Sequence, residues 1–205
     1  MTFKNVAVIC EGQTEVDFVK KLNKKYFNAK EISLKPITVN KTNAMNGSVS
    51  MDRIKYFINS ARENIVTTFI DYYGFKGVNN KSFQELEKEI ESLSRKEHTI
   101  AYVQLHETEA LWFSNIDVIK EVKNANKNQQ DELELIIKQY PNPEDINNSK
   151  ETAPSKRLEK IFSNYKKISD GNAISEQISI EEMKEKCPHF AEWLLRIETT
   201  VNSLR

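Results

Sequence analysis

The first 113 residues alternate between short apolar runs and stretches with helical periodicity, and this alternation restricts the possible folds more than any other feature. The apolar runs are rich in β-branched residues and have the length of strands. They cover residues 3–10, 32–39, 66–70 and 99–105. Strands that alternate with helices form parallel sheets with helices on their faces. We therefore predict an α/β fold, and Pro36 favours an edge position for the second strand.

Beyond residue 113 the pattern is helical, and proline residues separate the segments. We expect helices over residues 111–122, 132–140, 155–165, 172–178, 181–187 and 189–204. The chain is therefore expected to have an α/β core over residues 1–113 and a helical C-terminal extension over residues 114–205 that packs on the core. Residues 123–134 look most like a linker, and we expect a short exposed loop there that runs into a helix. Ser82 and Glu85 form a capping-box pattern that predicts the start of a helix in the core.

Composition excludes several classes of function. The 30 basic and 30 acidic residues cancel, which excludes a globally basic nucleic-acid coat but allows a local basic patch. Two cysteines are too few for a disulfide framework or a cysteine zinc site. No apolar run approaches the roughly 20 residues of a bilayer span, and the start lacks a signal-peptide pattern. We expect a cytoplasmic protein that does not associate with membranes. Walker A, GxGxxG and GxSxG motifs do not occur in the sequence.

Three of the four predicted strands end in an acidic residue, namely Glu11, Asp71 and Glu107. Parallel strands place their carboxyl ends at one edge of the sheet, where α/β folds bind ligands. Glu15, one turn into the first helix, and Glu109 are expected to face the same edge. Clustered carboxylates repel one another at neutral pH, and Mg²⁺ or Mn²⁺ would relieve that repulsion. The five acids therefore predict a metal site. The alternative is that single acids such as Glu15 only stabilise helix N-termini.

Five motifs, in this order, resemble those of a small bacterial Toprim-like family of unknown function. They are EGxTE from Glu11, IDYYG from Ile70, QLHExEAL from Gln104, ETAPSKRL from Glu151 and CPHFxxWL from Cys187. Toprim domains are the metal-binding domains of topoisomerases and primases, and they also occur in the overcoming-lysogenization-defect (OLD) nucleases. The resemblance implies a Toprim-like sheet and Mg²⁺- or Mn²⁺-dependent cleavage of DNA or RNA. It also implies a protein partner, an ABC- or OLD-type ATPase, and a role in phage defence.

Tyr73 departs from the general Toprim pattern, which has an Asp-x-Asp pair where this chain has Asp71 and Tyr73. A tyrosine is not an ordinary magnesium ligand at neutral pH. Glu107 or Glu109 would then replace the missing acid, while the resemblance makes Glu11 and Asp71 the first two ligands and catalytic residues. The departure also supports an alternative function, a non-catalytic Toprim-fold protein that binds or regulates an ATPase or binds nucleic acid.

Two basic residues and a histidine complete the candidate catalytic set. Lys156 and Arg157 lie at the start of a predicted helix, where they would hold a phosphate or stabilise charge during cleavage. The alternative is a solvated basic pair or a bridge to Asp145 or Glu144. His106 would carry a proton or orient a neighbouring acid, and the alternative is a hydrogen-bonded structural histidine.

Overall fold

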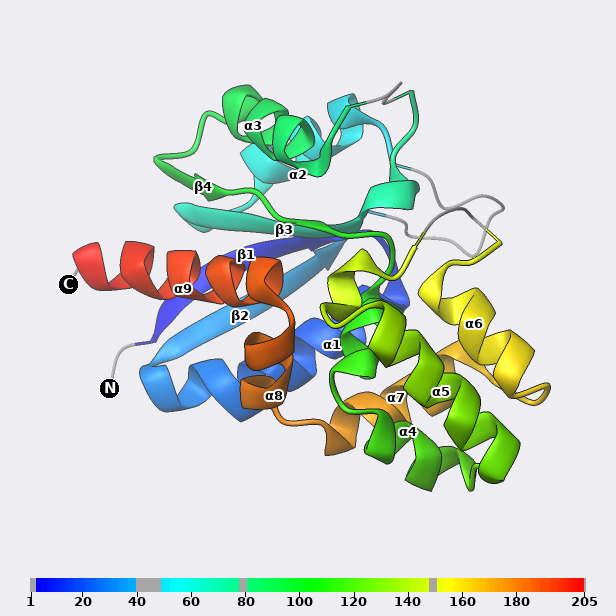
Figure 1. Cartoon of the computed structure of the whole chain (residues 1–205). Coiled ribbons are helices and arrows are strands. Elements are labelled where there is room, and N and C mark those ends of the chain that lie inside the picture. The colour runs from blue at the N-terminus through cyan, green and yellow to red at the C-terminus, as the bar shows by residue number, and fades with distance from the viewer. Residues whose placement is uncertain (1–2, 40–48, 78–80, 148–150, 205) are drawn as a thin grey trace. The chain divides into compact units, whose positions relative to one another are not determined.

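Within the part of the chain that the structure describes, five strands form one parallel sheet (Figure 1). The structure is a computed structural model and describes residues 3–39, 49–77, 81–147 and 151–204. The strands are β1 (Lys4–Cys10), β2 (Ile32–Thr38), β3 (Ile65–Asp71), β4 (His98–Ile100) and β5 (Val103–Gln104). Their order is β2-β1-β3-β4, and β5 also pairs with β3. The predicted α/β fold is confirmed, and Pro36 lies on an edge strand as expected.

The chain divides into two compact units. The first contains the residues up to Gln104 and those from Trp193 onward, and the second contains Leu105–Glu192. The domain bounds expected from the sequence, 1–113 and 114–205, stay a prediction, and the part of the final helix from Trp193 onward is grouped with the sheet. The indole nitrogen of Trp193 donates a 2.7 Å hydrogen bond to the Thr67 hydroxyl oxygen of β3.

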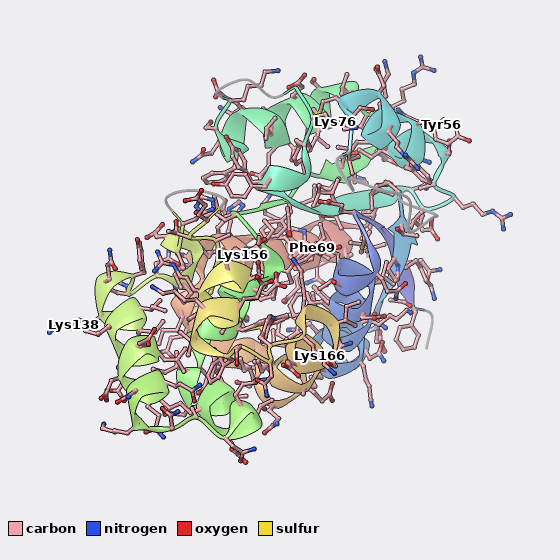
Figure 2. The ribbon with its side chains drawn as sticks, turned by 90° about the vertical axis from the view of Figure 1, so that its right-hand side faces the viewer. Tyr56, Phe69, Lys76, Lys138, Lys156 and Lys166 are labelled. Atoms are coloured by element: carbon pink, nitrogen blue, oxygen red, sulfur yellow. The ribbon has the colours of Figure 1, made fainter. Side chains whose placement is uncertain are left out.

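The helices of the first unit cover both faces of the sheet. They are α1 (Gln13–Leu22), extended by η1 (Asn23–Phe27) and η2 (Asn28–Lys30), then α2 (Met51–Ser60), η3 (Tyr72–Gly74) and α3 (Phe83–Leu93). One face packs against α2 and α3, with Ile54 and Ile90 in its buried cluster. On the other face the ring of Phe69, which is labelled in Figure 2, lies 5.4 Å from the ring of Phe18 of α1 and 5.3 Å from that of Trp193. The capping box of Ser82 and Glu85 is confirmed at the start of α3.

The fourth predicted strand, residues 99–105, is divided into β4 and β5 by Ala101 and Tyr102. At this break the side chain of Thr68 takes the place of a neighbouring strand. The Thr68 hydroxyl oxygen accepts the Tyr102 N–H and donates to the Tyr102 carbonyl, both at 2.8 Å. A threonine side chain thus satisfies the backbone groups that a continuous ladder would otherwise pair.

Side chains also occupy outward-facing backbone groups along the two edges of the sheet. On β2 the Leu34 N–H donates to Asn23 Oδ1 at 2.7 Å. Along the β4–β5 segment, the Ala101 N–H donates to a carboxylate oxygen of Glu91 at 3.0 Å, and the Val103 N–H donates to Glu87 at 2.9 Å. These three amide groups are satisfied without a further strand.

The second unit is built from helices. They are η4 (Thr108–Ser114), α4 (Ile116–Lys123), α5 (Lys127–Gln139), η5 (Pro143–Asp145), α6 (Pro154–Ile161), α7 (Lys167–Gln177) and α8 (Ile180–Lys186), and α9 (Pro188–Ser203) continues into the first unit. The stretch 123–134, expected as an exposed loop that runs into a helix, becomes helical earlier than expected, because Asn126 and Gln129 form a capping box that starts α5 at Lys127. In the described ranges no helix is both long and apolar enough to cross a membrane.

Candidate functional site

Glu11 and the segment after Asp71 lie against each other at the carboxyl ends of neighbouring strands. Cys10, the last residue of β1, is aligned with Phe69 of β3, so Glu11 and Asp71 leave the sheet at the same edge. A Cβ atom built on Gly74 would lie only 1.9 Å from Glu11 Oε2. The Glu11 carboxylate therefore fills the space that any larger residue at position 74 would need. Asp71 itself is 9% exposed.

Backbone hydrogen bonds hold the turn that carries Gly74. The Val49 N–H donates to the Gly74 carbonyl at 2.6 Å, and the Lys76 N–H donates back to the Val49 carbonyl at 3.1 Å. In the same turn the Tyr72 hydroxyl donates to the Lys81 carbonyl at 2.7 Å. Tyr73, which corresponds to the second aspartate of the Toprim pattern only by resemblance, is exposed. The turn is thus a fixed support for the Glu11 carboxylate.

Glu15 stabilises the start of α1. The Gly12 N–H donates a 2.9 Å hydrogen bond to Glu15 Oε2, which is the half of a capping box that a glycine N-cap allows, and Glu15 is 6% exposed. Burial, together with the negative charge of Glu15, raises the pKa of the Cys10 thiol. The structural role that the sequence left open for Glu15 is therefore present, while its role as a metal ligand stays a prediction.

Glu107 joins two of the sequence motifs within the second unit. Its Oε2 accepts the Ser155 N–H at 3.0 Å, in the first turn of α6, which begins at Pro154 as expected. The residue before this helix, Ala153, is not of a type that caps helices. A carboxylate from a distant part of the chain therefore supplies the cap, and the negative charge suits the N-terminal end of the helix dipole.

Glu109 is fully buried and lies beside a lysine that the sequence analysis did not consider. Lys167 Nζ is 3.2 Å from Glu109 Oε1 and 3.9 Å from Glu107 Oε1. Burial raises the pKa of Glu109 to about 7; Lys167 opposes this shift, and the charge of Glu107 adds to it. A carboxyl group with such a pKa exchanges its proton near neutral pH, as a general acid or base requires.

His106 has a left-handed backbone conformation, with φ of +68°, directly before Glu107. Histidine adopts this conformation more readily than most residues, and such positions are frequent at functional sites. Burial lowers the pKa of His106, although Asp145 and Glu107 oppose the shift. The imidazole is therefore neutral at pH 7, the form that accepts a proton.

The two basic residues of α6 have different surroundings. Lys156 is exposed, and its Nζ lies 2.6 Å from Oε2 of Glu159 one turn along the helix (Figure 2). Arg157 donates from Nε to the Thr152 carbonyl at 2.8 Å, and its guanidinium lies 5.1 Å from the Tyr140 ring centre. Neither partner is Asp145 or Glu144, the bridge considered from the sequence. Arg157 thus stabilises the approach to α6, and Lys156 faces solvent.

Glu144 has a role that the sequence analysis missed. The fully buried carboxylate accepts the His189 N–H at 2.9 Å and the Phe190 N–H at 3.0 Å, so it caps the start of α9. Burial raises the pKa of Glu144 in spite of these hydrogen bonds. The sequence signal for such a cap is Pro188, which begins a helix directly after Cys187. Cysteine does not usually cap helices, so a group from elsewhere in the chain is needed.

The donor chemistry of these acids, all of them carboxylates, suits a hard divalent cation. Among the residues that the structure describes, no three His, Cys, Asp or Glu side chains are grouped as a metal site. Two features nevertheless fit an ion. Gly74 leaves room for the Glu11 carboxylate, and the Lys167 ammonium group already places a positive charge beside Glu107 and Glu109. The five-acid ligand set stays a prediction.

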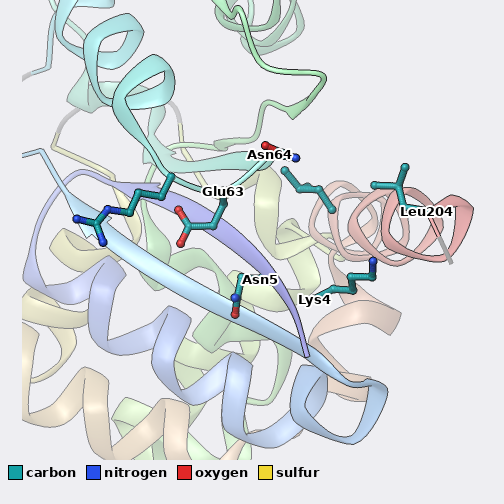
Figure 3. A pocket seen from close by; sticks show the side chains of 7 residues that line it. Lys4, Asn5, Glu63, Asn64 and Leu204 are labelled. Carbon is teal, nitrogen blue, oxygen red and sulfur yellow. The ribbon is translucent and has the colours of Figure 1, made fainter. Parts of the chain in front are cut away.

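A pocket of about 370 Å³ lies elsewhere in the first unit, at the amino ends of β1 and β3 (Figure 3). Its lining residues are Lys4, Asn5, Arg62, Glu63, Asn64, Ile65 and Leu204. Because Glu11 and Asp71 follow the carboxyl ends of the same strands, this pocket is separate from them.

Residues 10–198 match the family described as a domain of unknown function, DUF4276. The chain belongs to this family. No curated protein shows significant sequence similarity to this DUF4276 chain. Among solved structures, it resembles the C-terminal region of the OLD protein of Xanthomonas campestris pv. campestris, with a TM-score of 0.50 and 12% identity, over 98% of this chain and 97% of that chain. This likeness concerns the fold and agrees with the Toprim-like α/β architecture expected from the motifs.

Proposed function

We propose that this DUF4276 chain is a metal-dependent nuclease that hydrolyses phosphodiester bonds of DNA or RNA and acts with an ABC- or OLD-type ATPase in phage defence. The observation that carries the proposal is the contact between the Glu11 carboxylate and Gly74, three residues after Asp71. This contact holds Glu11, which follows β1, against the turn that follows the neighbouring strand β3. The fold shared with a region of an OLD protein supports the same conclusion.

Mg²⁺ or Mn²⁺, when bound, would supply positive charge to the scissile phosphate and lower the pKa of a bound water. Glu11 and Asp71 would hold the ion, with Glu15, Glu107 and Glu109 as the further ligands. Neutral His106 would accept a proton. The exposed Lys156–Glu159 ion pair is worth at most about 1 kcal/mol, so Lys156 can exchange its partner for a phosphate at little cost. Arg157 would keep α6 in place through its bond to Thr152.

The test follows labelled single- and double-stranded DNA and RNA in Mg²⁺ or Mn²⁺, without and with the ATPase recovered together with the tagged protein. We expect weak cleavage by the chain alone and clear cleavage with its partner. Asp71→Ala should abolish cleavage, whereas Asp52→Ala, which removes an exposed acid at the start of α2, should not. Cleavage that persists in Asp71→Ala would contradict the assignment.

The second candidate is a non-catalytic Toprim-fold protein that binds or regulates the ATPase. Exposed Tyr73 in place of an acid favours this function. Recovery of the ATPase with no cleavage of either nucleic acid, in several metals, would decide for this second function. A cytoplasmic location stays a prediction under both.

A further inference from the structure

The acids Glu107 and Glu109 share one positive charge within the second unit. Lys167 Nζ is 3.2 Å from Glu109 Oε1 and 3.9 Å from Glu107 Oε1. Glu107 uses its other oxygen to cap α6 through the Ser155 N–H. Glu109 is fully buried, and both of its carboxylate oxygens are inaccessible to solvent. When both acids are ionised, two carboxylates and one ammonium group leave the cluster with one uncompensated negative charge.

Lys167 differs from the acids in its exposure, because 40% of its side chain is accessible while Glu109 has none. It is also the first residue of α7, so its long side chain extends from a helix end. A lysine carries its charge on a flexible four-carbon stem and is strongly hydrated when it turns to water. Removing the ammonium group from the cluster therefore exposes a group that water solvates well, whereas removing Glu109 would require the η4 segment to open.

We propose that Lys167 is a displaceable internal cation that holds Glu107 and Glu109 together and competes with a divalent metal ion for the same carboxylate oxygens. This inference rests on the proposed metal-binding role of the two acids. A divalent ion brings two positive charges and balances both carboxylates, which the single charge of Lys167 does not. Metal binding at this pair then releases Lys167 to solvent. The affinity for metal is therefore set by how much more strongly the two carboxylates bind the metal ion than the Lys167 ammonium group.

The test is a titration with Mn²⁺ alone, with free Mn²⁺ followed by electron paramagnetic resonance and the melting temperature measured in parallel. Lys167→Gln removes the competing charge and should lower the Kd for Mn²⁺ by about 3- to 10-fold. Lys166→Gln is the matched control, because it removes one exposed charge from the neighbouring residue (Figure 2) and should leave the Kd unchanged. Lys167→Arg keeps the charge and should stay close to the wild type. Lys167→Met replaces the glutamine variant if the latter does not fold.

The possible failures are distinguishable. Equal Mn²⁺ affinity in the wild type and the Lys167→Gln variant would overturn the inference and leave the proposed nuclease standing. Mn²⁺ binding by neither protein would overturn the inference and the metal-dependent function together. Mn²⁺ binding by the Lys167→Gln variant and not by the wild type would support the inference, because Lys167 would then exclude the metal ion completely.

Discussion

Gly74→Ala should displace the Glu11 carboxylate while leaving the stability of the fold almost unchanged. The new Cβ would lie 1.9 Å from Glu11 Oε2, 2.6 Å from its Cδ and 3.1 Å from Oε1. To reach an ordinary contact of 3.4 Å, Oε2 must move by about 1.5 Å. The atoms that must move are the end of a flexible, partly exposed side chain, so the backbone can stay in place.

The expected change in stability is small because two effects oppose each other. An off-rotamer shift of Glu11 costs about 0.5–1.5 kcal/mol. Replacing glycine by alanine reduces the conformational freedom of the unfolded chain, which contributes about 0.4–1 kcal/mol in the other direction. The free energy of unfolding should therefore stay within about 1 kcal/mol of the wild type. A carboxylate displaced by more than 1 Å should nevertheless lower the cleavage rate by about 100-fold and weaken Mn²⁺ binding.

Gly171→Ala is the matched control for this substitution. Its Cβ would lie 3.4 Å from Trp112 Nε1 and 3.7 Å from the Tyr165 hydroxyl, both ordinary contacts. Position 171 is inside α7, where alanine should add about 0.5–1 kcal/mol of stability. Urea unfolding, Mn²⁺ titration and the nuclease assay are run on both variants. Wild-type metal affinity and rate in Gly74→Ala would refute the idea that the Gly74 turn positions a functional carboxylate.

Three further predictions concern single carboxylates. A raised pKa in the folded state means that the stability contributed by protonated Glu109 is present below pH 4.5 and lost as pH rises through about 7. Relative to Glu109→Gln, the wild type should lose on the order of 3 kcal/mol between pH 5 and pH 8 in urea unfolding, and parallel pH profiles would contradict this. Glu144→Ala should lower the free energy of unfolding by about 2–3 kcal/mol, because it removes two buried acceptors at the start of α9. Glu144→Gln should lower it by less. Equal free energies of unfolding for the wild type and both variants would show that the cap is dispensable. Glu11→Gln should not destabilise the metal-free protein, but in Mg²⁺ it should forfeit the stabilisation of order RT ln(1 + [L]/Kd); an equal loss in thermal melts with and without Mg²⁺ would make Glu11 a structural residue.

Local patterns in the sequence predict the sheet well. β-branched runs that end in an acid indicate where strands stop, and they predict that Glu11 and Asp71 follow strand ends at one edge of the sheet. Capping boxes are similarly local, and Ser82 with Glu85 begins α3 as expected. The parallel order follows from the alternation of strands and helices. These features depend on residues a few positions apart, which is why composition and periodicity suffice for them.

The contacts that define the charged clusters join residues far apart in the chain. Glu107 meets Ser155 across 48 positions, and Glu144 meets His189 across 45. Nothing in the periodicity of α7 distinguishes Lys167, its first residue, from its neighbour Lys166. The break between β4 and β5 is likewise decided by Thr68, a residue of another strand. Such pairings depend on tertiary packing, so the sequence names the acids but does not name their partners.

The occupied amide groups along the sheet edges restrict how other proteins can bind. An incoming strand needs unpaired N–H groups, yet those of Leu34, Ala101 and Val103 already donate to side chains of the same chain. Self-association by strand addition, the usual first step toward fibrillar aggregates, is opposed at these positions. Recognition of an ATPase or a nucleic acid would therefore depend on side chains of helices and loops, where specificity can change without any alteration of the sheet.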